Sequence, residues 1–231
     1  MLSFLHYAGM PEKWIVVSDG TLSDKDRDLL KALNSGVEFA EWTDFINDKN
    51  RRCVEPYSRA NPMGKKLALM TSLPSLPISL YIDTDVLFFP GAAELQELDM
   101  TTSRFLLDNS HGTVSSLLTP EEQKLPPVNG GFLIQATAIS WAEPLERLQA
   151  LIEKEPDLVS DPKKGHLLEQ TLLHLAYNAS GAQPLDSSRY VLKLDDAYDW
   201  QDRYVGKDIV LRHYVINTRM KFWRHARHFL K

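Results

Sequence analysis

Cysteine, long apolar runs and basic charge are all scarce in this sequence of 231 residues. A single cysteine, Cys53, excludes an internal disulfide framework and fits a reducing compartment, so we expect a cytoplasmic location. No stretch approaches the roughly 20 apolar residues needed to span a bilayer, so we expect no transmembrane segment. The net charge of −5 argues against a nucleic-acid partner, because the only basic concentration lies between Arg212 and Lys231.

The pattern of apolar residues predicts an α/β protein. Strands are expected at residues 14–17, 37–41, 78–82, 105–107, 128–134, 190–194 and 209–211. Helices are expected at 23–36, 63–73, 141–155 and 166–178, with a short one beginning near Thr119. This alternation favours a mostly parallel, twisted sheet with helices on both faces. Without a repeat or a clear linker, we expect one domain over residues 1–231.

Two carboxylates stand inside an otherwise apolar run at residues 80–89. In an extended chain, residues two apart face the same side, so Asp83 and Asp85 should point together. Two partly desolvated carboxylates that lie close together repel each other unless a cation joins them. Mg²⁺ and Mn²⁺ favour carboxylate ligands, so the pair predicts a divalent metal site. The alternative is a turn at the end of a strand with two solvated aspartates.

Four further polar segments are weak signals when each is taken alone. Asn129-Gly130-Gly131 can be a tight turn, and Glu169-Gln170 can be a solvated helix start. Lys65-Lys66 can be surface charge, and His213 can be an ordinary histidine at the end of a strand. Their significance depends on their occurring together and in this order.

Together with the Asp-x-Asp run, these segments resemble the motifs of GT-A fold glycosyltransferases, above all glycosyltransferase family 8 and its relatives. The similarity covers about residues 10–225. It implies a metal-dependent transfer of a sugar from a nucleotide-diphosphate sugar, by family habit a UDP-sugar, to an unknown acceptor with retention of configuration. The residues that it assigns are metal ligands Asp83, Asp85 and His213; donor contacts Lys66, Asn129, Gly130 and Gly131; and Glu169 and Gln170 near the reacting carbon or the acceptor hydroxyl.

The chain departs from the family pattern at both ends. The family's late motif, His-x-x-Gly-x-x-Lys-Pro-Trp, lacks its glycine here, and Arg219 stands at the lysine's spacing. Arg219, or alternatively Lys221, is expected to contact the donor diphosphate. The family's first strand is missing, so the domain is expected to be incomplete at its N-terminus.

Two other interpretations stay open at this point. One is a phosphohydrolase of the haloacid-dehalogenase type, whose first motif is also Asp-x-Asp and whose late acidic motif would be residues 195–199. That first motif normally opens its domain, whereas Asp83 follows some eighty residues of α/β pattern. The other is a catalytically inactive GT-A protein that acts by binding.

Overall fold

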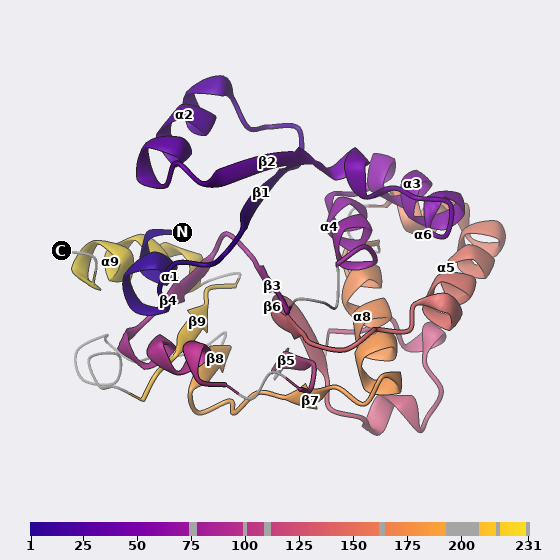
Figure 1. Ribbon diagram of the computed structural model, residues 1–231. Coiled ribbons are helices and arrows are strands. Elements are labelled where there is room, and N and C mark those ends of the chain that lie inside the picture. The colour runs from indigo at the N-terminus through magenta and orange to yellow at the C-terminus, as the bar shows by residue number, and fades with distance from the viewer. Residues whose placement is uncertain are drawn as a thin grey trace.

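The computed structural model describes residues 1–73, 78–98, 101–108, 112–161, 165–192, 208–215 and 218–229. Within these residues the strands form three small sheets (Figure 1). Their bounds are β1 Trp14–Ser18 and β2 Val37–Glu41 in the first sheet; β3 Ser79–Ile82, β6 Val128–Gln135, β5 Arg104–Leu107 and β7 Gln183–Pro184, in that order, in the second; β4 Val86–Phe88, β9 Leu211–His213 and β8 Tyr190–Leu192 in the third.

Parallel and antiparallel pairs occur side by side, so the predicted α/β class is confirmed but the sheet is mixed rather than mostly parallel. β6 runs antiparallel to both β3 and β5, and β4 runs antiparallel to β9. The pairs β1–β2, β5–β7 and β8–β9 are parallel. The alternation of strands and helices predicted the elements, but it does not reveal a strand that returns in the opposite direction.

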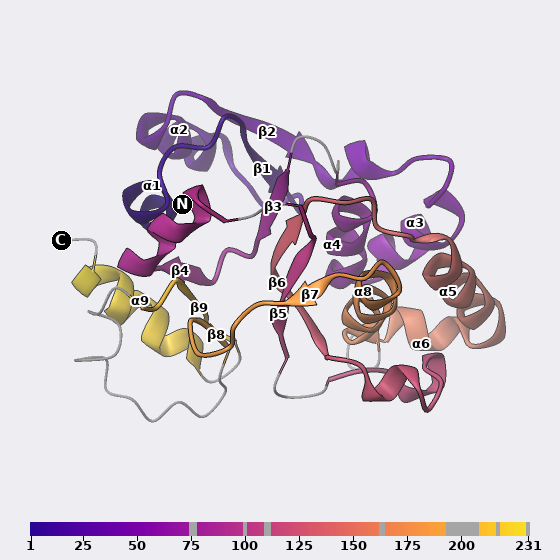
Figure 2. The same cartoon turned by 60° about the horizontal axis from the view of Figure 1, so that its bottom comes forward.

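The helices gather at two ends of the molecule in both ribbon views, with α1 and α9 at one end and α3, α5 and α6 at the other (Figures 1 and 2). The bounds of the α-helices are α1 Leu2–Tyr7, α2 Asp24–Leu33, α3 Arg51–Ala60, α4 Pro62–Met70, α5 Ala142–Lys154, α6 Pro156–Ser160, α8 Leu168–Ala179 and α9 Arg219–Phe229. Short 3₁₀ segments cover Trp42–Phe45, Pro90–Gln96, Ser115–Leu117 and Glu122–Lys124. No helix in the described ranges is long and apolar enough to cross a membrane.

Local sequence explains where helices α2 and α4 begin. Ser23 caps α2 in a reciprocal capping box with Asp26, as its spacing predicts. Asn61 caps α4 by accepting a hydrogen bond from the Met63 amide. Helix α3, which the sequence reading missed, packs against α4, and a Cβ at Gly64 would lie only 2.4 Å from the Ser58 amide nitrogen. Only glycine allows this close approach of the two helices.

Strand β6 is the buried centre of the fold. All eight of its residues are buried, and α8 packs directly against it. Its neighbour β3 is less buried, because Ser79–Ile82 are all only half-buried. Among the described residues β3 and β1 are both edge strands, and the residues of both line one large open cleft. The expectation that this chain lacks the family's first strand stays a prediction.

Candidate metal centre

Asp83 and Asp85 lie where the chain passes from one sheet to another. β3 ends at Ile82 and pairs with β6, while β4 begins at Val86 and pairs with β9. The residues between them form a turn, in which the Val86 amide donates a hydrogen bond to the Asp83 carbonyl at 3.3 Å. The predicted convergence of the carboxylates is therefore observed, but the predicted reason is wrong. The turn, rather than the alternation of an extended strand, brings the two side chains together.

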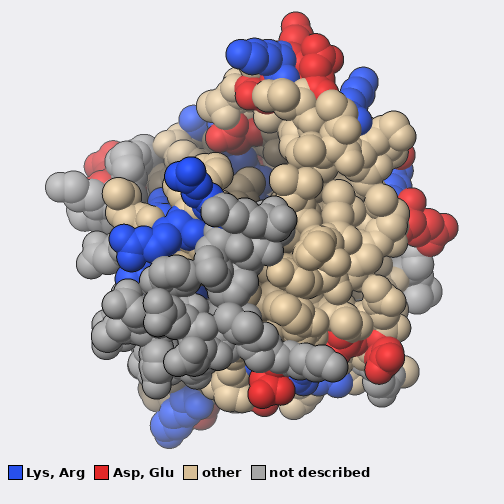
Figure 3. Space-filling view, turned by 90° about the vertical axis from the view of Figure 1, so that its left-hand side faces the viewer, with Lys and Arg blue, Asp and Glu red and all other residues tan. Residues whose placement is uncertain are grey.

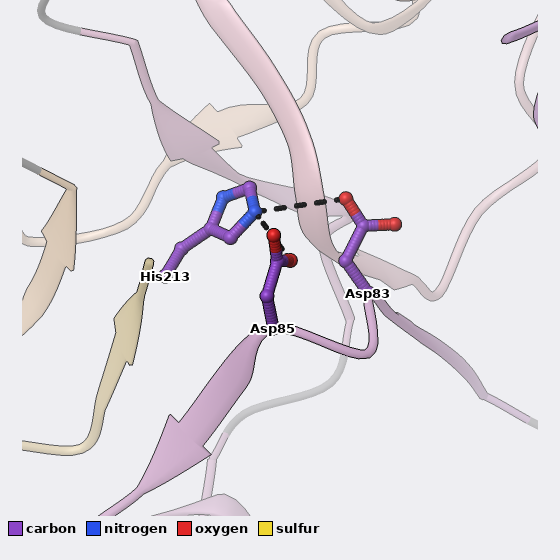
Figure 4. A group of neighbouring side chains, drawn as sticks. All are labelled: Asp83, Asp85 and His213. Carbon is purple, nitrogen blue, oxygen red and sulfur yellow. Dashed lines mark hydrogen bonds and ion pairs between the residues drawn. The ribbon is translucent and has the colours of Figure 1, made fainter. Parts of the chain in front are cut away.

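His213 reaches the same point from the end of β9. The antiparallel register places it opposite Val86, the residue that follows Asp85. Its Nε2 atom lies 3.1 Å from Asp85 Oδ1 and 3.6 Å from Asp83 Oδ2 (Figure 4). The three side chains offer ligand atoms that all lie within 4.8 Å of one another. The structure thus brings together the three residues predicted to hold the cation.

Asn129 determines which nitrogen of His213 faces the carboxylates. The Gly131 amide donates to Asn129 Oδ1 at 2.9 Å, so that atom is an acceptor, and His213 Nδ1 lies 2.9 Å from the same oxygen. Nδ1 must therefore carry the proton that the oxygen accepts. In the neutral ring, Nε2 then presents its lone pair to two carboxylates, which is unfavourable unless a cation lies between them. This donor set fits a divalent metal ion.

Gly131 makes room for the imidazole. A Cβ at this position would lie 2.1 Å from His213 Nδ1, so any side chain would displace the ring. The sequence allowed Asn129-Gly130-Gly131 to be a tight turn, but in the structure this segment is a bulge inside β6. Phe105 of β5 pairs with Leu133 of β6, but the next residue, Leu106, pairs with Asn129. Residues 130–132 of β6 therefore have no partner on β5.

A buried ammonium supports the Asp83 side of the centre. Lys66 Nζ, on α4, donates to Asp83 Oδ2 at 2.9 Å and lies 3.4 Å from Glu169 Oε1 on α8. The Tyr81 hydroxyl donates to the other oxygen of Asp83 at 2.6 Å. Tyr81 was not among the predicted site residues, although it lies on β3 only two residues before Asp83. These contacts hold the carboxylate in one orientation, as the outer contacts of a metal ligand do.

Charge balance explains the pKa shifts of this group. Burial alone would lower the pKa of Lys66, but the charges of Asp83 and Glu169 outweigh it and raise that pKa above its ordinary value. Burial is also the main reason that the pKa of Glu169 is raised, while Lys66 opposes the shift. Lys66 is therefore a permanent positive charge beneath the centre.

Arg219 contacts the opposite side of the centre. Its Nε donates to Asp85 Oδ2 at 3.0 Å from the first turn of α9. Burial tends to raise the pKa of Asp85, but the hydrogen bond and charge that His213 supplies when its ring is protonated, together with Arg219, lower it below its ordinary value. Arg219 lines the cleft, whereas Lys221 is half-buried and is not part of the lining. Of the two alternatives for the diphosphate contact, the structure thus brings Arg219 to the centre.

The two residues predicted near the reacting carbon, Glu169 and Gln170, differ in how deeply their side chains are buried. Glu169 is only 3% exposed and lies beneath Lys66 and Gly130. Gln170 is half-buried, and its amide donates to Asp108 Oδ2 and, at 3.0 Å, to the Gly112 carbonyl. Asp108 was not among the predicted site residues. Asp108 and Gln170 are 62 residues apart in the chain, so no local sequence pattern could predict their contact.

The centre opens into a cleft of about 2080 Å³, which is larger than a typical pocket for a small molecule. Most of the predicted site residues line it: Lys66, Asp83, Asp85, Asn129, Gly130, Glu169, Gln170, His213 and Arg219. Lys65 lines it as well and donates to the Asp19 carbonyl at 2.5 Å. The proposed late acidic motif at residues 195–199 lies outside the described residues.

Comparison with known proteins supports the fold. No protein-family model matches the chain, and no curated protein matches its sequence significantly. The apo structure of mouse xyloside xylosyltransferase 1 is similar over 94% of this chain and 90% of that one, with a TM-score of 0.55 and 16% identity. Galactosyltransferase LgtC, in complex with donor and acceptor sugar analogs, is similar over 99% of this chain and 90% of that one, with a TM-score of 0.52 and 13% identity. At this level of identity the similarity shows the fold alone, and it confirms the expected GT-A-like α/β fold.

Proposed function

We propose that this chain is a single GT-A-like domain that transfers a sugar from a nucleotide-diphosphate sugar to an acceptor in a metal-dependent reaction. The observation that carries this proposal is the convergence of Asp83, Asp85 and the Nε2 atom of His213 at the mouth of an open cleft. The fold shared with a xylosyltransferase and a galactosyltransferase supports it. Membership of glycosyltransferase family 8, a UDP-sugar donor, hexosyl transfer and retention of configuration are finer parts of the same proposal.

Asp83, Asp85 and His213 would hold Mn²⁺ or Mg²⁺. When bound, such an ion neutralises the negative charge that develops on a diphosphate leaving group. Arg219 lies at the cleft beside Asp85, and its planar guanidinium suits phosphate oxygens. Arg219 would therefore orient the diphosphate next to the ion and add electrostatic stabilisation in the transition state.

The remaining residues divide into those that reach substrate and those that position them. Asn129, Gly130 and Gln170 line the cleft and would contact the donor sugar or the acceptor hydroxyl. Gly131 is absent from the lining and acts by leaving space for the His213 ring. Glu169, assigned near the reaction by resemblance, is buried against Lys66 and would act through that ammonium.

The phosphohydrolase alternative loses its support in the structure. The fold is similar to those of two sugar transferases, and the Asp-x-Asp turn lies between β3 and β4, after two other strands of the fold. The inactive GT-A binding protein remains the second outcome that an experiment must separate.

The test supplies the purified protein with Mn²⁺ and a panel of UDP- and GDP-sugars, and measures release of the nucleotide diphosphate with EDTA as a control. Release from a particular sugar donor that EDTA abolishes is the expected result. Donor binding that requires Mn²⁺ but gives no release with any acceptor tried would identify a binding protein. Hydrolysis of simple phosphomonoesters, or no metal-dependent binding of any nucleotide sugar, would overturn the proposal.

A further inference from the structure

Helix α9 is fixed to the body of the protein by one face. Phe222 and Ala226 pack against a buried apolar cluster that includes Tyr214, and the Tyr214 and Phe222 rings meet edge to face at 5.4 Å. His225 is 1% exposed, and its Nδ1 lies 2.6 Å from the Tyr214 hydroxyl. Positions 222, 225 and 226 share one helix face, so these contacts determine which side of α9 points outward.

The outward face carries the most exposed large apolar side chains of the described chain. Met220 is 86% exposed and Trp223 is 76% exposed. Arg224 and Arg227 are exposed as well, and the four residues follow the spacing i, i+3, i+4 and i+7 of a single helix face. A stripe that combines methionine and tryptophan with two arginines is unlike an ordinary solvated face, which would be polar or charged throughout.

The charge of this helix opposes that of the whole protein. Between Arg219 and Phe229 there are four lysine or arginine residues and no acidic residue, whereas the chain has a net charge of −5. Figure 3 faces the side of the molecule that carries α9 in Figure 1, and Lys and Arg side chains gather on the left half of that view. An excess of positive charge kept on one surface of an acidic protein indicates a negatively charged partner.

We propose that α9 docks lengthwise on an anionic phospholipid surface. Arginines on the exposed stripe would meet headgroup phosphates, while Trp223 and Met220 enter the boundary between headgroups and acyl chains. A membrane accounts for both kinds of side chain, whereas a nucleic acid would leave the exposed Met220 unexplained. An 11-residue helix is about 16 Å long, which suits surface binding and not insertion across a bilayer.

This placement has a consequence for the cleft. Arg219 begins the same helix and contacts Asp85 of the metal centre. A membrane that covers the outer face of α9 would therefore lie close to the cleft, and an acceptor anchored in that membrane would have a short path to it. The docking itself requires neither a donor nor a metal, so it can be tested apart from the proposed function.

The test is sedimentation of the purified full chain with vesicles of phosphatidylcholine alone and of phosphatidylcholine with 30% phosphatidylglycerol. We expect binding only to the anionic vesicles, and release at high salt. Arg224→Ala with Arg227→Ala should weaken binding roughly 30-fold, since each basic residue near the surface contributes about 1 kcal/mol. Met220→Ser with Trp223→Ser should weaken it even at low salt.

A matched control removes two arginines from the opposite end of the molecule. Arg51 and Arg52 are exposed on α3, so Arg51→Ala with Arg52→Ala changes the net charge equally and should leave vesicle binding unchanged. Circular dichroism checks that each variant is folded. The proposal is overturned if the wild-type protein does not bind vesicles that contain phosphatidylglycerol, or if the α3 control loses as much vesicle binding as the α9 variants. It is also overturned if a nucleic acid binds through the α9 face while vesicles do not bind.

Discussion

Two charged clusters in this molecule both combine carboxylates with basic side chains, and they differ in what they leave unsatisfied. At the edge of α5, Arg147 forms a two-point contact with Glu122, with both N–O distances at 2.8 Å, and also donates to the Leu117 carbonyl at 2.7 Å. Glu143 adds a second, more exposed carboxylate. Within this cluster the strong donors and acceptors meet one another, so it needs no further ligand.

The metal centre is not balanced in this way. Three carboxylates, on Asp83, Asp85 and Glu169, face one buried ammonium and the largely exposed guanidinium of Arg219. When the His213 ring is neutral, its nitrogen that faces two of these carboxylates presents a lone pair. The comparison teaches that a count of charged neighbours does not identify a site. A cluster that is complete without a ligand stabilises the fold, and one that is incomplete indicates what it binds.

The largest expected effect comes from a direct metal ligand. Asp85→Asn removes a negative oxygen ligand and should weaken Mn²⁺ affinity by more than about 100-fold, because even residues that only orient ligands contribute 10- to 100-fold. Isothermal titration calorimetry with Mn²⁺ measures this loss. Asp28→Asn, an exposed aspartate on α2, is the matched control and should bind Mn²⁺ as the wild type does. Retained affinity in Asp85→Asn would remove this residue from the ligand set.

A nearly equal loss is expected where no ligand is changed. Gly131→Ala places a Cβ 2.1 Å from the His213 ring, so the imidazole must move away from the carboxylates. We expect Mn²⁺ affinity to fall about 100-fold. Gly36→Ala, where the nearest atom is a side-chain oxygen at 3.3 Å, serves as the control. Unchanged Mn²⁺ binding in Gly131→Ala would show that His213 is not a ligand.

A smaller loss should follow removal of the group that orients His213. Asn129→Leu deletes the oxygen that accepts from Nδ1, so the tautomer is no longer held and Mn²⁺ affinity should drop about 10- to 100-fold. Asn129→Asp keeps an acceptor at the same place and should recover part of the loss. If both variants bind Mn²⁺ equally weakly, Asn129 acts through packing and not through the ring nitrogen.

The smallest effect on metal binding is expected in the cluster of Arg147, Glu122 and Glu143. Arg147→Met should leave Mn²⁺ affinity unchanged while lowering the free energy of unfolding by about 1–3 kcal/mol. The hydrogen bonds from Arg147 lower the pKa of Glu122 from 4.5 to about 2. A lowered pKa stabilises the folded state above the unfolded value, so this contribution is lost as pH falls from about 4.5 to 2.

Urea unfolding over this pH range provides the measurement. The wild-type protein should lose stability toward pH 2 more steeply than Arg147→Met, because only the wild type has the paired carboxylate. Parallel pH curves for the two proteins would show that the Arg147–Glu122 pair contributes no net stability.

Much of the fold was predictable from short segments. Helices were expected at 23–36 and 63–73, and α2 and α4 begin there at Ser23 and Asn61, whose side chains bond to nearby amides; β2 covers the expected strand at 37–41. Helix α3 was missed because Pro56 interrupts its pattern and its stability comes from packing against α4. The separate strand β4 was also missed, since one continuous apolar run conceals a change of sheet.

The site was predictable as a set of residue types but not as a geometry. Asp-x-Asp, an Asn-Gly-Gly segment and a late histidine gave the three residues that converge at the candidate metal centre and the residue that orients one of them. Tyr81 and the preference for Arg219 over Lys221 were not predictable, because both depend on directions that side chains take in the folded chain.

By itself, the sequence determined most of the elements and supplied the carboxylate and imidazole groups available for a cation. Those features follow from local hydrogen bonding and from the periodicity of apolar residues. Only the tertiary structure decided that a turn joins the two carboxylates, that a bulge in β6 makes space for His213, and that α9 presents Trp223 outward. Each of these depends on atoms that are far apart in the chain and meet only when the sheets and helices pack.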